Sequence, residues 1–255
     1  MTAALADAVR DAGALALAKF RATYKSWTKD ANSPVSEVDI AVDEFLHARL
    51  SAIDPACGWL SEESVDAPTR LDCPAVWIVD PIDGTRAFIA GKTDWAVSAA
   101  LIGNGRPVAA ALFAPAENNL FLATAGGGAT LNGRTIAVQG QRLEGARTAG
   151  PKPRLDALAG LGIVALPKVH SLALRLARVA QGTIDIAIAG GNSHDWDIAA
   201  ADLIVHEAGG RLTGFDGHNP TYNRPNPVHG ALVAASNARH TALLQRIGDG
   251  SVRLS

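Results

Sequence analysis

The segment Asp80-Pro81-Ile82-Asp83-Gly84-Thr85 follows the apolar run Trp77-Ile78-Val79 and places two carboxylates close together. Carboxylate oxygens are ligands that Mg²⁺ prefers, and water and phosphate oxygens can complete its coordination. Pro81 stiffens the bend, and the backbone amides of Gly84 and Thr85 can donate to a phosphate. From these residues alone, the alternative is a turn in which Asp-Pro and Asp-Gly cap the next element.

Two further acidic segments lie far from this motif in the sequence. Glu62 and Glu63 follow an apolar stretch, and Asp195-Trp196-Asp197 opens another. Each segment alone is typical of a helix start, where the helix dipole stabilises an acid. Bringing all three acidic segments together would be costly without a cation to neutralise them. A metal site would explain such a convergence.

The hydrophobic pattern predicts the elements that carry these residues. Apolar residues recur at three- and four-residue intervals over 5–20 and 38–50, which predicts two amphipathic helices, the second with Ser36 as its N-cap. Short apolar runs bounded by turn residues then predict strands at 77–79, 95–102 and 108–113, followed by further strands and turns over 121–124 and 129–138, with Asn132-Gly133 as a turn. The first half is therefore predicted to pack helices on an antiparallel sheet.

Strands and helices alternate in the second half. The pattern predicts a buried strand over 161–166, a helix over 171–180 with Ser171 as its cap and Gly182 at its end, a strand over 184–189, a long helix over 195–208 and a last strand over 231–235. Glycines and Pro151 cluster at 140–151. We place the boundary there, between an N-terminal half, 1–145, with the main metal motif and a C-terminal half, 146–255, with the Trp-Asp motif and the substrate loop.

Composition narrows the class of partner. The 255 residues are 48% hydrophobic and carry a formal net charge of -2 with no long run of one sign, which predicts neither a nucleic-acid groove nor a membrane anchor. A small charged metabolite is the expected partner. The two cysteines, Cys57 and Cys73, predict reduced thiols rather than a disulfide framework. Charges interrupt the N-terminal apolar run, so we expect no signal peptide and a cytoplasmic protein.

Taken in order, the motifs resemble the inositol monophosphatase superfamily of Mg²⁺-dependent, lithium-sensitive phosphatases. Asp80 to Thr85 is similar to its first signature, and Trp196-Asp197 through Glu207 to Gly210 is similar to its second. Ser61 to Ser64 resembles its glutamate loop. Lys29 with Ser33-Pro34 and Asp39 resembles its N-terminal segment, and Ala234 to Asn237 its last strand. Such a set in one order is far more specific than one short motif.

The resemblance implies a mixed α+β and α/β fold, a layered α-β-α-β-α sandwich, with two or three Mg²⁺ ions. Glu62, Asp80 and the Ile82 carbonyl would hold one ion, and Asp80, Asp83 and Asp197 a second. Glu62, Thr85 and Asp39 would be the catalytic residues around an attacking water. The phosphate and substrate contacts would come from Asp83, Gly84, Thr85, His194 and Asp195. Li⁺ and Ca²⁺ are expected to inhibit, and a homodimer is compatible with the family.

Two other classes of function are a phosphatase with an aspartyl nucleophile and a non-catalytic family member. The Asp-Gly-Thr sequence superficially resembles haloacid-dehalogenase phosphatases, but those need two acids separated by one residue, whereas Asp80 and Asp83 are separated by two. A non-catalytic family member kept for binding or regulation would be favoured by loss of a metal ligand. Every required acid is present, so catalysis is the preferred hypothesis.

The substrate is the open question at this stage. The stretch Gly190 to His194 lacks the acid that inositol-preferring relatives place a few residues before the Trp-Asp pair. Asp195 is either a partial replacement or a helix cap. The neutral loop could admit adenosine, as in bacterial 3'(2'),5'-bisphosphate nucleotidases. Inositol monophosphate, 3'-phosphoadenosine 5'-phosphate, fructose 1,6-bisphosphate and histidinol phosphate all remain candidates.

Overall fold

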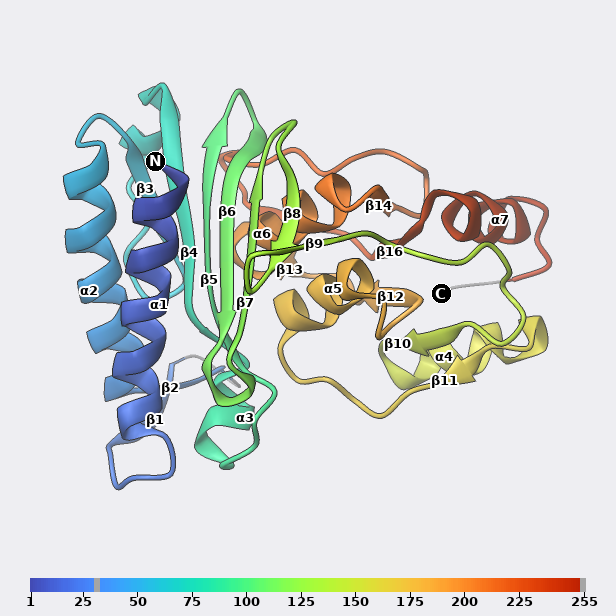
Figure 1. Ribbon diagram of the computed structural model, residues 1–255, viewed down its shortest axis with the longest axis horizontal. Helices are drawn as coiled ribbons and strands as arrows, with labels where there is room; N and C mark the ends of the chain where they lie inside the picture. The colour runs from blue at the N-terminus through green and yellow to red at the C-terminus, as the bar shows by residue number, and fades with distance from the viewer. Residues whose placement is uncertain (30–32, 253–255) are drawn as a thin grey trace.

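The computed structural model describes residues 1–29 and 33–252, which form five alternating layers of helices and sheets (Figure 1). The outer layer on the left of Figure 1 is α1 (Thr2–Lys19) with α2 (Glu37–Ile53). A seven-stranded sheet follows, then a central layer of α5 (Leu172–Gln181) and α6 (Asp195–Glu207), a five-stranded sheet, and the outer helices α4 (Lys152–Leu158) and α7 (Asn237–Gly248). The predicted α-β-α-β-α sandwich is confirmed.

The first sheet carries the main acidic motif. Its strand order is the chain order, β3 (Gly58–Ser61), β4 (Ala75–Asp83), β5 (Ala96–Gly103), β6 (Arg106–Ala114), β7 (Asn119–Thr124), β8 (Gly128–Leu131) and β9 (Arg134–Ile136). Only the β3–β4 pair among these neighbours is parallel. The predicted antiparallel sheet is therefore correct except at this edge, which is the edge that brings Glu62 to Asp80.

The second sheet is built from the second half of the chain. Its order is β11 (Val164–Ala165), β10 (Arg147–Ala149), β12 (Ile186–Ala189), β16 (Leu232–Ser236) and β14 (Gly210–Gly214). The predicted buried strand over 161–166 is wrong: Gly162 has a positive φ of 71°, and only two exposed residues after it join the sheet edge. The remaining described α-helix and strands are small. They are the short helix α3 (Thr85–Ile89), the strand pair β1 (Ser26–Lys29) with β2 (Ser33–Ser36), and the strand pair β13 (Ser193–His194) with β15 (Val228–His229).

Alternation along each strand explains why there are five layers. In β4, Val76 and Ile78 pack toward α5 and α6, whereas Trp77 and Val79 pack toward α1 and α2. Successive side chains of a strand point to opposite faces, so a strand that is apolar throughout is covered on both sides. The second sheet repeats this arrangement, because Ala187 packs toward α5 and α6 and its neighbour Ile186 toward α4 and α7.

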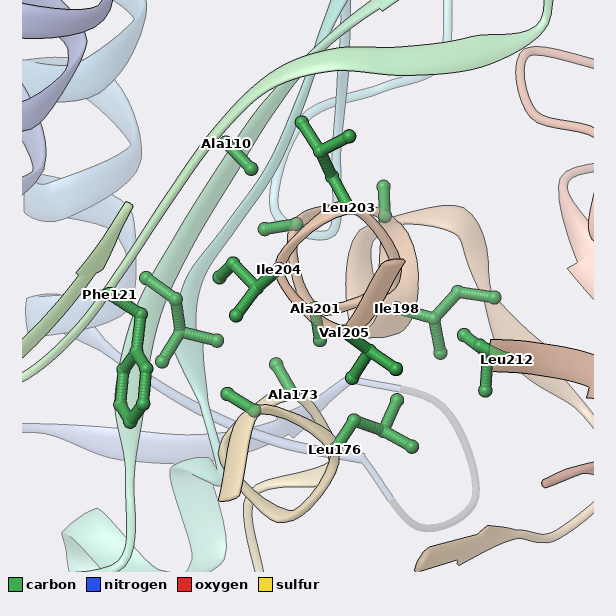
Figure 2. Packing of buried hydrophobic residues seen from close by; sticks show 14 of the residues in the cluster. Ala110, Phe121, Ala173, Leu176, Ile198, Ala201, Leu203, Ile204, Val205 and Leu212 are labelled. Atoms are coloured by element: carbon green, nitrogen blue, oxygen red, sulfur yellow. The ribbon is translucent and has the colours of Figure 1, made fainter. Parts of the chain in front are cut away.

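The central helices lie between the two sheets, and α6 is apolar nearly all round. Figure 2 shows Ile204 pointing toward Phe121 of the first sheet and Ile198 pointing toward Leu212 of the second. A helix that is hydrophobic on every side is typical of a fully enclosed one. This burial fixes the first turn of α6, and with it Asp197, relative to the end of β4.

The two predicted halves correspond to the two sheets. The proposed division at 145/146 falls between β9 and β10. It stays a prediction as a domain boundary, because the largest core cluster takes side chains from both halves, for example Leu112 and Leu174. No helix in the described part of the chain has the length and apolar character needed to cross a membrane.

Candidate active site

Three acids from two layers of the fold converge on one point. Ligand oxygens of Asp80, Asp83 and Asp197 all lie within 4.8 Å of one another. Asp80 and Asp83 lie at the end of β4, and Asp197 lies in the first turn of α6. They line a cavity of about 270 Å³ together with Glu62, Gly84 and Thr85. These are six of the residues that the sequence predicts for metal, phosphate or water.

The parallel edge of the first sheet supplies Glu62. Ser61 of β3 is opposite Val79 of β4, and the Glu62 amide donates to the Val79 carbonyl at 3.3 Å. Parallel strands end at the same edge of a sheet, so the next residues, Glu62 and Asp80, emerge side by side. The convergence of the first two acidic segments is thus a consequence of strand direction.

A break in the β4–β5 ladder shapes the main motif. Asp80 is opposite Ser98, but Asp83 is opposite Ala96, so β4 has one more residue than β5 across this stretch. Pro81 cannot donate to a ladder, and proline within sheets is found at such bulges. Gly84 follows with a positive φ of 95°, and a Cβ there would come within 3.3 Å of the Ser171 backbone nitrogen. Glycine is therefore required where β4 turns into α3.

The start of α5 holds Asp83. Its carboxylate accepts hydrogen bonds from the Ser171 hydroxyl at 2.5 Å and from the amides of Leu172 and Ala173 at 3.2 and 2.6 Å. Ser171 is also the N-cap of α5, accepting from the Leu174 amide at 2.9 Å. The cap is predicted by the sequence, but its contact with Asp83 is not, because 88 residues separate the pair.

Asp39 and Thr85 form a hydrogen-bonded pair beside the cluster. The Thr85 hydroxyl lies 2.9 Å from Asp39 Oδ1 and 3.0 Å from the Ile82 carbonyl oxygen. The other carboxylate oxygen of Asp39 accepts from the Ser36 amide at 2.8 Å and so closes the capping box of α2. Two of the three predicted catalytic residues, Asp39 and Thr85, are therefore held by helix α2 and by the Ile82 carbonyl at the end of β4.

Lys29 ties the glutamate loop to the β1–β2 hairpin. Its ammonium lies 3.4 Å from Glu62 Oε1 and 2.6 Å from Glu63 Oε1, and it donates to the Glu62 carbonyl at 3.1 Å. Burial raises the pKa of Glu62 to about 7, an effect that Lys29 opposes and that Glu63 and Asp83 reinforce. The sequence indicates Lys29 only as part of a family motif and does not predict this ion pair.

The charge balance of the cluster fits a cation. Burial, first, and then the neighbouring carboxylates raise the pKa of Asp80 well above its usual range, and burial does the same to Asp197. One oxygen of Asp80 is buried with no hydrogen-bond partner in the described part of the chain. A buried carboxylate oxygen normally has a partner. Oxygen ligands crowded at this point, with one unsatisfied, match the donor set of Mg²⁺.

The two predicted substrate contacts are His194, the N-cap of α6, and Asp195, its first residue, and neither lines the cavity of the acid cluster. Asp195 is fully buried, with Oδ1 2.6 Å from His229 Nε2 and Oδ2 accepting from the Asn223 amide at 2.8 Å. The N-cap of α6 is His194, so the structure does not give Asp195 the predicted role of helix cap; its carboxylate holds His229 and the Asn223 backbone instead. The His194 amide donates to Asp197 at 2.6 Å, and its ring stacks on Trp196 with centroids 4.5 Å apart. Substrate contact by either residue stays a prediction.

The raised pKa of Glu62 predicts how stability depends on pH. An acid whose folded-state pKa exceeds its ordinary value of 4.5 binds protons more tightly when folded, so its contribution to stability is lost as pH rises from about 4.5 to about 7. Without divalent metal, wild type should therefore lose more stability than Glu62→Gln across this window. Urea unfolding at pH 5, 6, 7 and 8 in chelator measures the difference, and parallel curves for the two proteins would contradict it.

Comparison with known proteins agrees with this geometry. Residues 1–249 match the inositol monophosphatase family. The chain is 33% identical to an inositol-1-monophosphatase of Mesorhizobium japonicum over 84% of this chain and 82% of that one, and 32% identical to a histidinol-phosphatase of Mycobacterium tuberculosis over 88% of each. A relative named 3'(2'),5'-bisphosphate nucleotidase CysQ, from Aggregatibacter actinomycetemcomitans, is 29% identical over 77% of each chain.

A solved structure carries the same fold. The extragenic suppressor protein suhB from Bartonella henselae superposes with a TM-score of 0.86 at 29% identity, over 97% of this chain and 98% of that one. The predicted resemblance is confirmed by whole-chain matches in both sequence and structure. The chain belongs to the inositol monophosphatase family.

Proposed function

We propose that the protein is a Mg²⁺-dependent phosphomonoester hydrolase that transfers the phosphoryl group of a small metabolite directly to water. The observation that carries this proposal is the convergence of Asp80, Asp83 and Asp197 with a buried Asp80 oxygen that has no hydrogen-bond partner among the described residues. The family and its relatives named as phosphatases support the reaction class. Because water attacks phosphorus directly in this proposal, the reaction has no covalent enzyme intermediate.

The acids and one carbonyl would hold the ions. Asp80, Asp83 and Asp197 form one ligand set, and Asp80, Glu62 and the Ile82 carbonyl form another that shares Asp80. Bound Mg²⁺ supplies positive charge that polarises the phosphate and lowers the pKa of a coordinated water. We propose two ions as the active complement and a weaker third beside Glu62, with Asp39 behind it.

The remaining steps belong to side chains of the protein. Glu62 lines the cavity beside the acid cluster, and its carboxylate is the group that we assign to take a proton from the attacking water. The Thr85 hydroxyl, fixed by Asp39, orients that water. We assign the phosphate to the backbone amides of Gly84 and Thr85, because both residues line the cavity that contains the acids.

The substrate is one of a short set. Inositol monophosphate, 3'-phosphoadenosine 5'-phosphate, fructose 1,6-bisphosphate and histidinol phosphate are the candidates, and relatives named for three of these activities span that range. The loop before α6 carries no acid between Gly190 and His194, which weakens recognition of a polyol. The phosphatase reaction is common to all four candidates.

Phosphate release from these four compounds tests the proposal. We expect turnover of at least one with Mg²⁺, inhibition by Li⁺ and Ca²⁺, and none in chelator. Glu62→Gln should lower kcat by about 10²–10⁴-fold through loss of an oxygen ligand and a proton acceptor. Glu44→Gln, at an exposed position of α2, is the matched control and should be unchanged. A folded protein that hydrolyses none of the four would instead favour a non-catalytic family member.

A further inference from the structure

A second, wider groove opens beside the catalytic cavity and shares part of its wall. The groove has a volume of about 790 Å³, and Lys168 and His170 line both it and the cavity. It lies where the loop after α3 meets the segment that enters α5, joined by a hydrogen bond from the Ser171 amide to the Asp94 carbonyl at 3.2 Å (Figure 1). A substrate whose reacting phosphate occupies the cavity can therefore extend into this groove.

The groove is positively charged although the chain as a whole is not. Its wall carries four cationic side chains, Arg21, Lys92, Lys168 and Arg178. Its two acids are both engaged, Glu117 by Arg178 and Asp94 by His170. Among the described residues, neither Lys92 nor Lys168 has a carboxylate partner. Two ammonium groups are thus left to face a ligand.

Lys92 is held in position by a hydrogen-bonded relay. Asp94 Oδ2 accepts from the His170 amide at 2.7 Å and lies 2.6 Å from His170 Nδ1. An ionised carboxylate only accepts, so Nδ1 carries the hydrogen and Nε2 is left as an acceptor. The Lys92 ammonium lies 3.1 Å from Nε2 and donates to it. This chain of contacts fixes one positive charge at the wall shared by groove and cavity.

We propose that Lys92 and Lys168 form a second anion subsite, which selects phosphomonoesters that carry a second phosphate on the same molecule. This inference rests on the proposed function, because it needs the reacting phosphate to lie at the carboxylate cluster. The groove volume is within the range of sites for small molecules. A lysine ammonium is a compact charge suited to phosphate. A small bisphosphate therefore fits these observations better than a polymer.

Matched pairs of substrates test the subsite. Adenosine 3'-phosphate and 3'-phosphoadenosine 5'-phosphate share one reacting ester, as do fructose 1-phosphate and fructose 1,6-bisphosphate. In at least one pair, wild type should have a KM about tenfold lower for the bisphosphate. Lys92→Met and Lys168→Met should each remove most of this difference. Lys92 lines the groove but not the catalytic cavity, so Lys92→Met should also leave kcat and the monophosphate KM within about twofold of wild type. Lys92→Arg should retain it, and Lys152→Met, on distant α4, should change nothing.

Each contrary result has a distinct meaning. Equal KM values within both pairs for wild type, or equal effects of the lysine variants on both members, would overturn the subsite while leaving the phosphatase proposal intact. Binding of a fluorescent single-stranded RNA that depends on Lys92 and Lys168, without any discrimination between paired substrates, would assign the groove to nucleic acid instead. If inositol monophosphate, 3'-phosphoadenosine 5'-phosphate, fructose 1,6-bisphosphate and histidinol phosphate all show no Mg²⁺-dependent turnover, the proposed function and the subsite are overturned together.

Discussion

Replacing Asp80 by asparagine is expected to abolish Mg²⁺-dependent phosphatase activity and, at the same time, to stabilise the metal-free protein. Asp80 belongs to both proposed ligand sets, so its loss should lower kcat by about three orders of magnitude, roughly 4 kcal/mol of barrier. Without metal, the same change removes a buried charge that faces Glu62, Asp83 and Asp197. The free energy of unfolding at pH 8 should rise by about 1–3 kcal/mol.

Thermal unfolding with and without Mg²⁺ separates the two effects. Wild type should be stabilised by about 2.7 kcal/mol when Mg²⁺ is present at a hundred times its dissociation constant, whereas Asp80→Asn should gain much less. Asp156→Asn is the control, because Asp156 is an exposed residue of α4 whose ion pair in the described part of the chain is with Lys152. A metal-free Asp80→Asn protein that melts below wild type would show that the cluster is not under electrostatic strain.

The second large effect is expected at Asp195, where alanine should lower the free energy of unfolding by about 3 kcal/mol or more. The fully buried carboxylate is the acceptor for both His229 and the Asn223 amide, and its removal leaves two buried donors without partners. Asp195 is the first residue of α6, so the position of Asp197 should loosen as well. Urea unfolding measures the first effect, and the Mg²⁺ dependence of activity measures the second.

Asparagine and a double mutant sharpen this test. Asp195→Asn keeps one side-chain acceptor and should lose less stability than the alanine variant. The losses in Asp195→Ala and His229→Ala should be strongly non-additive, because they remove the two ends of one contact. If Asp195 instead contacts substrate, its replacement should raise KM for one substrate only, with stability near that of wild type.

Local patterns predicted the elements best where the signal was long or chemically specific. The helices at Thr2–Lys19 and Glu37–Ile53 follow from apolar periodicity, and the limits of Leu172–Gln181 follow from the Ser171 cap and the left-handed Gly182. The strand predicted over 161–166 is wrong, because the apolar run does not show that Gly162 takes a left-handed backbone conformation. Helix α7 was not predicted, because Leu243 is its single fully buried hydrophobic residue among those described.

The site was predicted in its acids but not in the side chains that hold them. Residue types alone left each acidic segment open to interpretation as a turn or a helix cap, and only their order along the chain, through family resemblance, joined them. The contacts of Lys29 with Glu63, of Ser171 with Asp83 and of Asp195 with His229 depend on tertiary packing. No local spacing encodes such pairs, because their partners are 34 or more residues apart in sequence.

The extra residue in β4 determines the face of the sheet to which Asp83 points. In a regular strand, residues three apart point to opposite faces, so Asp80 and Asp83 would be separated by the thickness of the sheet. One additional residue in β4, opposite the stretch from Ser98 to Ala96 of β5, restores the same side to both carboxylates. It also withdraws the Ile82 carbonyl from the ladder, where it accepts from Thr85. A spacing of three with a bulge thus presents two carboxylates and one carbonyl, the groups that we propose as metal ligands, where a spacing of two in an unbroken strand would present the two carboxylates alone.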